Sequence, residues 1–252
     1  MRGINLLHLS LFFLLFFFIK QSVNAGTLSV AVSSNFSQLI KPIIVEFKKN
    51  YSVEVNVSIG STANIYHQII NGAPYDIFLA ADQKHPKLLR KKNFSTHKNF
   101  TYACGKLVLW SKKKLEKPFD LTIITNNNKV ISIANPKTAP YGKAAKEYLI
   151  NTKTFNSLEK NLVIGTNVAQ VFHFAKTKSV DFAFVALSQI KYYNVPETNF
   201  YIIPKELYKP IMQDAIILNN DKNTKLSEKF YNFLKTNKIR DIIKRNGYDI
   251  NC

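Results

Sequence analysis

The sequence predicts an α/β protein whose parallel sheets are covered by helices on both faces. Three observations support this fold class. Short apolar runs typical of strands alternate with segments of helical spacing along the whole chain. Of the 252 residues, 46% are hydrophobic, which is enough for one large or two medium-sized domains. No linker, repeat or low-complexity tract divides the chain into separate halves.

The first 25 residues have the layout of a secretory signal peptide. Arg2 gives a basic start, a mostly apolar run extends over residues 6–19, and small residues at 23–25 suit a cleavage point. The run is shorter than the roughly 20 residues that a membrane-spanning helix needs, although an uncleaved anchor is the alternative. Gly26 follows the cleavage point, where a lipoprotein would need cysteine. We expect residues 1–25 to be removed and the mature protein to lie in the periplasm.

Nine segments after the signal peptide are predicted to be strands, because they are short and mostly apolar. In chain order they are Thr27–Val32, Val53–Ser58, Asp76–Ala80, Lys106–Trp110, Val130–Ala134, Leu162–Ile164, Phe182–Val185, Tyr201–Ile203 and Ala215–Leu218. Alternation of such strands with helices favours parallel pairing, since a parallel connection needs a crossover helix.

Helical spacing of apolar residues predicts the elements between the strands. One face of the first helix runs from Phe36 to Phe47, and Pro42 inside it is expected to bend it. Ile65, Ile69 and Ile70 mark the second helix, and further helices are predicted to begin near Gly142, Val168 and Ser188. The apolar positions from Leu226 to Ile243 predict one or two closing helices.

The charge of the chain is strongly basic, with 35 Lys and Arg against 16 Asp and Glu and a formal net charge of +19. An exported protein rarely meets nucleic acid, so we expect no nucleic-acid partner. Beyond the signal peptide only Arg90, Arg240 and Arg245 are arginines, and the lysines are scattered. We interpret the charge as a solvated surface with mild attraction for anions. Cys104 and Cys252 are the only cysteines, and their separation neither supports nor forbids a disulfide.

Four strand-to-helix junctions are the candidate functional positions, because ligands of open α/β sheets bind beyond the carboxyl ends of the strands. They lie at residues 32–36, 60–64, 135–143 and 165–170, and each offers N-cap residues or a glycine-containing turn. Any one of them alone is explained by ordinary helix capping. If the four converge, exposed N–H groups and hydroxyls would hold a dianion without lysine or arginine.

The mature chain resembles the periplasmic molybdate-binding proteins of ABC-type molybdate importers, from about Thr27 to Ile250. The most specific match is Gly60-Ser61-Thr62 followed by the run from Gln68 to Asp82, QIINGAPYDIFLAAD. Supporting matches lie at residues 31–36, 134–136, 139–142 and 244–248. The order and spacing of these segments make the resemblance specific.

The resemblance implies a type II periplasmic binding protein with two lobes and the oxyanion in the cleft between them. We expect lobe 1 to comprise residues 26–104 plus 212–252, and lobe 2 residues 105–211. The ligand contacts that it implies are Ser34, Asn35, Ser61 and Thr62 from lobe 1, with Tyr141 and Val168 of lobe 2 acting mainly through backbone N–H groups.

The resemblance also implies the function. The protein would capture molybdate, and tungstate with it, for the membrane subunits of an ABC importer. It would act as a monomer without catalytic residues or cofactor, and molybdenum would be bound only as the oxyanion. Some relatives place a tyrosine hydroxyl on the ligand where this chain has Ala186, so the donor set is expected to differ from theirs.

Other functions remain open at this stage. The receptor could take another oxyanion such as sulfate. A secreted hydrolase could use Ser34 or Ser61 as nucleophile with one of His67, His85, His97 or His173 as base, although no GxSxG motif surrounds either serine. A receptor for amino acids usually needs arginine for a carboxylate, and this chain has few. Tyr192-Tyr193 could suggest a ferric site, but it lacks nearby His or carboxylate ligands, so we interpret it as packing.

Overall fold

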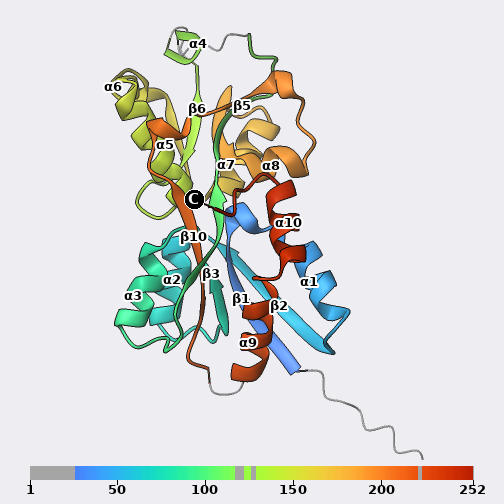
Figure 1. The fold of residues 1–252 in the computed structure, drawn as a ribbon. Coiled ribbons are helices and arrows are strands. Elements are labelled where there is room, and N and C mark those ends of the chain that lie inside the picture. The colour runs from blue at the N-terminus through green and yellow to red at the C-terminus, as the bar shows by residue number, and fades with distance from the viewer. Residues whose placement is uncertain (1–25, 117–121, 126–128, 221–222, 252) are drawn as a thin grey trace, which may run out of the picture.

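The computed structural model describes residues 26–116, 122–125, 129–220 and 223–251. The expected signal peptide and Cys252 lie outside the described residues. Two five-stranded sheets form two lobes, one above the other in Figure 1. Within the described ranges, no helix has the length and apolar character needed to cross a membrane.

The sheet of lobe 1 has the strand order β2-β1-β3-β10-β4. Its strands are β1 (Gly26–Ser33), β2 (Val53–Gly60), β3 (Ile77–Leu79), β4 (Phe100–Gly105) and β10 (Ile211–Ile217). β1 pairs in parallel with β2 and β3, whereas β10 runs antiparallel to β3 and β4.

The sheet of lobe 2 has the order β7-β6-β8-β5-β9. Its strands are β5 (Leu107–Ser111), β6 (Ile131–Ala134), β7 (Leu162–Gly165), β8 (Phe182–Ala186) and β9 (Phe200–Ile202). β6 pairs in parallel with β7 and β8, and β5 runs antiparallel to β8 and β9. The two-lobed α/β fold is therefore confirmed, and both sheets are mixed because the strands near the crossings run against their neighbours.

The chain crosses between the lobes at Lys106, which separates β4 from β5, and again just before β10, which runs through the waist of the molecule in Figure 1. Each of the nine predicted strands corresponds to an observed one, but β4 was not predicted and β10 begins earlier than Ala215. Gln213 and Asp214, which precede the predicted strand, are fully buried in β10 and form hydrogen bonds there.

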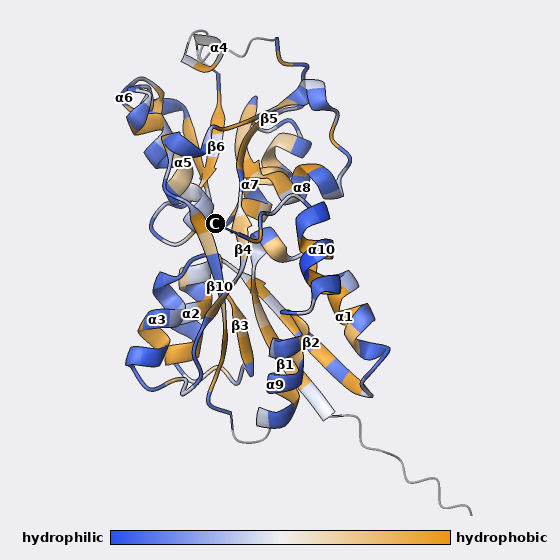
Figure 2. Ribbon diagram, in the orientation of Figure 1, coloured by the Kyte–Doolittle hydropathy of each residue, from blue (hydrophilic) through white to orange (hydrophobic). Residues whose placement is uncertain are grey.

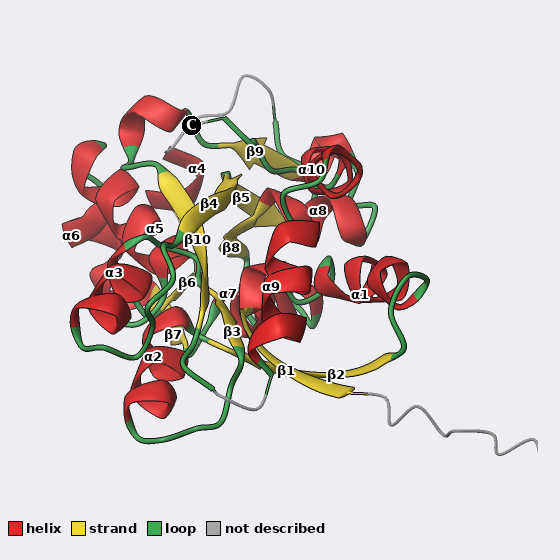
Figure 3. Cartoon of the chain, turned by 60° about the horizontal axis from the view of Figure 1, so that its bottom comes forward, coloured by secondary structure: helices red, strands yellow, loops and turns green. Residues whose placement is uncertain are grey.

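Helices cover both faces of the lobe 1 sheet (Figure 3). One face carries α1 (Ile40–Lys48), α9 (Thr224–Phe233) and α10 (Asn237–Arg245), and the other carries α2 (Thr62–Ile70) and α3 (Lys84–Lys91). Alternate residues of β1 serve the two faces, so that Val30 and Val32 belong to the core under α1 and Ala31 to the core under α2. Figure 2 shows the strands mainly as hydrophobic and the helices as a mixture of hydrophilic and hydrophobic residues.

The predicted bend at Pro42 does not arise inside a helix. A short 3-10 turn, η1 (Ser34–Phe36), follows β1, and α1 begins only at Ile40. Pro42 therefore lies in the first turn of α1, where its missing N–H removes no intrahelical hydrogen bond.

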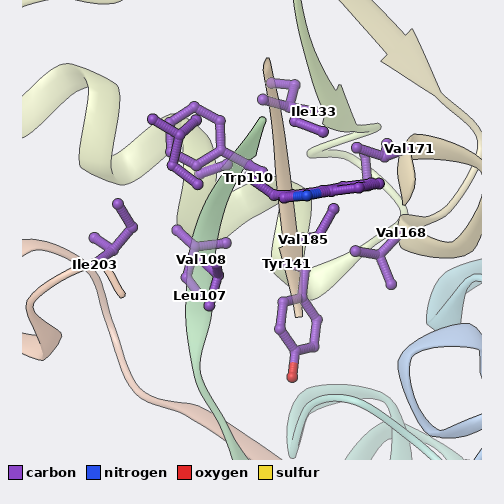
Figure 4. Close-up of a cluster of buried hydrophobic side chains, with 14 of the residues drawn as sticks. Leu107, Val108, Trp110, Ile133, Tyr141, Val168, Val171, Val185 and Ile203 are labelled. Atoms are coloured by element: carbon purple, nitrogen blue, oxygen red, sulfur yellow. The ribbon is translucent and has the colours of Figure 1, made fainter. Parts of the chain in front are cut away.

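The helices of lobe 2 are α4 (Thr122–Thr125), α5 (Pro140–Asn151), α6 (Phe155–Leu158), α7 (Val168–Lys176) and α8 (Leu187–Tyr192). On one face of the sheet Trp110 of β5 stacks on Phe172 of α7, with ring centroids 4.4 Å apart. On the other face Tyr148 of α5 contacts Phe184 of β8 at 5.6 Å. Figure 4 shows part of this single large core.

Cys104 of β4 is disulfide-bonded, and the only other cysteine of the sequence, Cys252, lies outside the described residues. Cys104 also exchanges two backbone hydrogen bonds with Asp249, of 2.7 and 3.0 Å. The C-terminal segment is thus attached to the strand that leads into lobe 2.

Candidate functional site

The four junctions lie at the carboxyl ends of parallel strands in both sheets. In lobe 1, Ser33 at the end of β1 pairs with Gly60 at the end of β2. In lobe 2, Ala134 at the end of β6 pairs with Gly165 at the end of β7. The turns η1 and α2 start directly after the first pair, and α5 and α7 start shortly after the second. This is the edge at which open α/β sheets bind ligands.

The junctions of the two lobes also face each other. Ala63 N–H, in the first turn of α2, donates across the cleft to Thr138 O at 3.0 Å. Ser188 Oγ of lobe 2 donates to Asn35 O of lobe 1 at 3.1 Å, and α7 contacts η1. All six residues named by the resemblance are buried in this region: Ser34, Asn35, Ser61, Thr62, Tyr141 and Val168. Junctions of the two lobes are therefore in contact with each other, which the anion-site hypothesis requires.

Ser61 is the most informative of these residues. It is the N-cap of α2, is only 3% exposed and makes no side-chain capping bond. Its Oγ is buried and has no hydrogen-bond partner among the residues that the structure describes. A buried hydroxyl without a partner costs about 1–3 kcal/mol, so such groups usually indicate a partner from outside the chain. The helix dipole at this position favours an anionic one.

Thr62 shares its hydroxyl with Ser33 at an Oγ1–Oγ distance of 2.7 Å. Ala81 N–H donates toward both oxygens, at 3.2 Å to Thr62 and 3.0 Å to Ser33. The two hydroxyls carry two protons, and only one is used between them. The second is available to an anion. Sequence reasoning did not select Ser33, although it lies in the first junction, because the resemblance pointed to the residues after it.

Asn35 does not offer its side-chain nitrogen to a ligand. Its Nδ2 donates to Gln213 Oε1 at 2.8 Å and to Tyr248 OH at 3.1 Å, which uses both of its protons. The group that Asn35 can give to an anion is its backbone N–H, which, like that of Ser34, has no acceptor within the short turn η1.

Tyr141 lies in the first turn of α5, and its hydroxyl accepts a hydrogen bond from Gln213 Nε2 at 3.4 Å. Figure 4 shows its hydroxyl directed away from the apolar cluster of lobe 2. Burial raises the pKa of Tyr141 well above its ordinary value near 10, so the hydroxyl keeps its proton at physiological pH. The resemblance implies mainly a backbone contact for Tyr141, whereas the structure also makes its hydroxyl a candidate donor.

Val168 opens α7. The Asn167 side chain caps the N–H groups of Ala169 and Gln170, at 2.9 and 3.1 Å, and leaves that of Val168 outside the cap. Ala186, at the end of β8, has no polar side chain, and its N–H donates to Gln189 Oε1 at 3.0 Å.

Within the described part of the chain, the residues of the alternative functions do not form a second site. Ser61 Oγ has no histidine partner there, and His85 Nδ1 instead pairs with Asp82 Oδ2 at 2.7 Å. Tyr193 stacks on Phe172 at 4.5 Å, as expected for packing. Among the described residues, no group of three or more His, Cys, Asp or Glu side chains could hold a metal ion.

A cavity of about 410 Å³ lies between the lobes beside these junctions. Ala81, whose N–H donates toward Ser33 and Thr62, and Thr138, whose carbonyl accepts from Ala63 N–H, are both part of its wall. Lys84, Lys137, Lys143 and Lys209 line it together with Asp82 and Glu147, so its wall carries more basic than acidic side chains.

Comparison with known proteins agrees with this geometry. The family described as bacterial extracellular solute-binding protein matches residues 28–249. The molybdate-binding protein ModA of Azotobacter vinelandii is 38% identical over 91% of this chain and 92% of its own. ModA of Rhodobacter capsulatus is 34% identical over 89% and 88%. The solved structure of the periplasmic molybdate-binding protein of Azotobacter vinelandii has a TM-score of 0.82 and 33% identity, covering 88% of this chain and 98% of that one.

Proposed function

The chain belongs to the bacterial extracellular solute-binding proteins, and we propose that it captures molybdate between its two lobes and passes it to an ABC importer. Two relatives named as molybdate-binding proteins share 38% and 34% identity with it over nearly its whole length. The protein is a binding protein of the extracytoplasmic space and not an enzyme. Cleavage after residue 25, release into the periplasm and action as a monomer are part of the proposal.

We propose that the oxyanion lies where the four junctions meet. Hydroxyls of Ser61, Tyr141 and the Ser33–Thr62 pair would donate to it, together with backbone N–H groups of Ser34, Asn35 and Val168. The observation that carries this proposal is the buried Ser61 Oγ, which has no partner among the described residues and caps no N–H of its helix. The lobes would comprise residues 26–104 plus 212–252 and residues 105–211, with hinges at the two crossings.

Neutral donors on rigid elements select an oxyanion by size. Molybdate and tungstate are tetrahedral dianions of nearly equal size, whereas sulfate has the same charge and shape but shorter bonds. A cavity shaped for the larger ions leaves gaps around sulfate, and each lengthened hydrogen bond weakens binding. Closure of the lobes excludes water and strengthens the remaining bonds.

Calorimetric titration of the purified mature protein tests the proposal. We expect molybdate and tungstate to bind with similar affinity and to raise the melting temperature, and sulfate to bind at least about a hundredfold more weakly, or roughly 2.7 kcal/mol. Sulfate binding as tight as molybdate would contradict selection by size and favour the sulfate receptor. No binding of any of the three ions would refute the proposed function.

Replacing Thr62 with alanine is expected to weaken molybdate binding by about 1.5–3 kcal/mol. The change removes one of the two paired hydroxyls, and with it the proton that the pair can donate to the charged anion. Calorimetry of this variant beside Ser33→Ala checks the pairing of the two hydroxyls. The Ser33→Ala protein should lose affinity by a similar amount, because either deletion breaks the 2.7 Å bond that orients the other hydroxyl. Unchanged affinity in both variants would remove the pair from the site.

A further inference from the structure

Gln213 connects the two lobes through a single side-chain amide. It lies in β10, near the crossing, and is 0% exposed. Its Oε1 accepts from Asn35 Nδ2 of lobe 1, and its Nε2 donates to the Tyr141 hydroxyl of lobe 2. Tyr102 OH also lies 3.2 Å from Oε1. If the neighbouring groups have fixed donor and acceptor roles, the oxygen and the nitrogen of the Gln213 amide cannot exchange places.

The orientation of the Gln213 amide is set by the backbone carbonyl of Asn35, because a carbonyl oxygen can only accept hydrogen bonds. Tyr248 OH lies 2.8 Å from Asn35 O and 3.0 Å from Ser188 Oγ, so its proton is directed to that side. The lone pairs of the Tyr248 oxygen are then left for the Asn35 side chain, 3.1 Å away. The amide group nearest Tyr248 must therefore be the NH₂ group of Asn35, whose second proton is directed to Gln213.

The same logic extends to Tyr141. Because Oε1 of Gln213 faces the Asn35 donor, its Nε2 must face the Tyr141 oxygen, and that oxygen acts as an acceptor in the bond. The Tyr141 proton is consequently directed elsewhere. Gly105 lies against this hydroxyl, since a Cβ there would be 2.2 Å from the Tyr141 oxygen, and only glycine fits beside it.

We propose that Gln213 is a positioning and specificity-determining residue, which directs the Tyr141 proton so that the hydroxyl acts toward the anion as a donor, and so favours oxyanions that carry no proton. The inference rests on the proposed function, because it assumes that the anion lies against this hydroxyl. Molybdate, tungstate and sulfate carry no proton at neutral pH. Hydrogenphosphate has the same charge as sulfate and nearly the same size, but its P–O–H group needs an acceptor. A donor facing that group leaves two protons opposed, and neither finds an acceptor.

The test compares sulfate with hydrogenphosphate, each competing against molybdate in mildly alkaline buffer, where both are dianions. Because the two ions have the same charge and nearly the same size, these properties do not affect the ratio of their affinities. The ratio therefore reports whether the site offers the anion hydrogen-bond donors alone or also an acceptor. Gln213→Met keeps the length of the side chain but has no N–H. We expect the sulfate to hydrogenphosphate ratio to fall about tenfold, because the freed Tyr141 hydroxyl can turn and accept from P–O–H. Tyr102→Phe, which removes another neighbour of the same amide oxygen, should leave the ratio unchanged.

Two further variants keep the inference falsifiable. In a Tyr141→Phe background Gln213→Met should not change the ratio, because no hydroxyl is left to orient. Tyr141→Phe alone should lower the ratio, and it serves as the test if Gln213→Met does not fold. Molybdate binding with an unaltered ratio in Gln213→Met or Tyr141→Phe would show that Gln213 is only structural. Absence of molybdate binding to the unmodified protein would instead refute the proposed function itself.

Discussion

Replacing Ser61 with alanine is expected to lower molybdate affinity by about ten- to a hundredfold without destabilising the unliganded protein. A hydrogen bond to a charged acceptor contributes about 1.5–3 kcal/mol. The hydroxyl of Ser61 makes no bond within the described chain, so its removal costs the empty protein nothing that the structure shows. Most buried serines behave in the opposite way, because their hydroxyls are already used within the fold.

Ser132 is the matched control. It is also buried, but its Oγ donates to Val163 O at 2.8 Å within the sheet of lobe 2. Ser132→Ala should lower the free energy of unfolding by about 1 kcal/mol and leave molybdate affinity intact. Urea denaturation of the empty proteins, together with calorimetric titration, measures both quantities. If Ser61→Ala lost stability and kept its affinity, Ser61 would be a structural residue and the proposed site would be wrong.

The sequence predicts the lobe 1 and lobe 2 junctions from local signals alone. Ser61 after a strand and before a helix is an N-cap by type, and Asn167 is confirmed as one. Whether Ser61 caps its helix or contacts a ligand depends on the residues that face it. One residue on the facing side is Thr138, whose carbonyl accepts from Ala63 N–H, and it lies far from Ser61 along the chain. Local pattern therefore finds the candidate positions, and only the fold can show that they converge.

The residues that orient the site have no such local signal. Gln213 and Tyr248 are 178 and 213 positions from Asn35, and no motif in the sequence joins them to it. Gln213 lies before Ala215, where the predicted strand began, and a polar residue in a central strand is unexpected unless its partners are known. Tyr248 belongs to the C-terminal segment 244–248 that supports the resemblance, but its role depends on a backbone carbonyl that only the structure places beside it.

Replacing Gly105 with alanine is expected to weaken molybdate binding by about 1–3 kcal/mol, roughly five- to 150-fold, while the protein stays folded. A Cβ at this crossing would lie 2.2 Å from the Tyr141 oxygen and 2.7 Å from Gln213 Nε2. The Tyr141 ring is buried in the lobe 2 core and has little room to move. The clash is therefore relieved mainly by displacement of lobe 2 from the crossing, which draws the Tyr141 hydroxyl out of the cleft.

Gly142→Ala separates this effect from simple overpacking. A Cβ at Gly142 would lie 1.9 Å from Ala134 O, and both residues belong to lobe 2, so no movement between the lobes relieves the contact. The Gly142→Ala protein should have a lower melting temperature while its affinity for molybdate is little changed. The Gly105→Ala protein should keep its melting temperature without ligand, but molybdate should no longer raise that temperature. Small-angle scattering with saturating molybdate should then show a larger radius of gyration for Gly105→Ala than for the unmodified protein. The new methyl group should displace the Tyr141 hydroxyl, which could then no longer hold the anion. If Gly105→Ala nevertheless bound molybdate as tightly as the unmodified protein and became equally compact, closure would not bring the Tyr141 hydroxyl onto the anion.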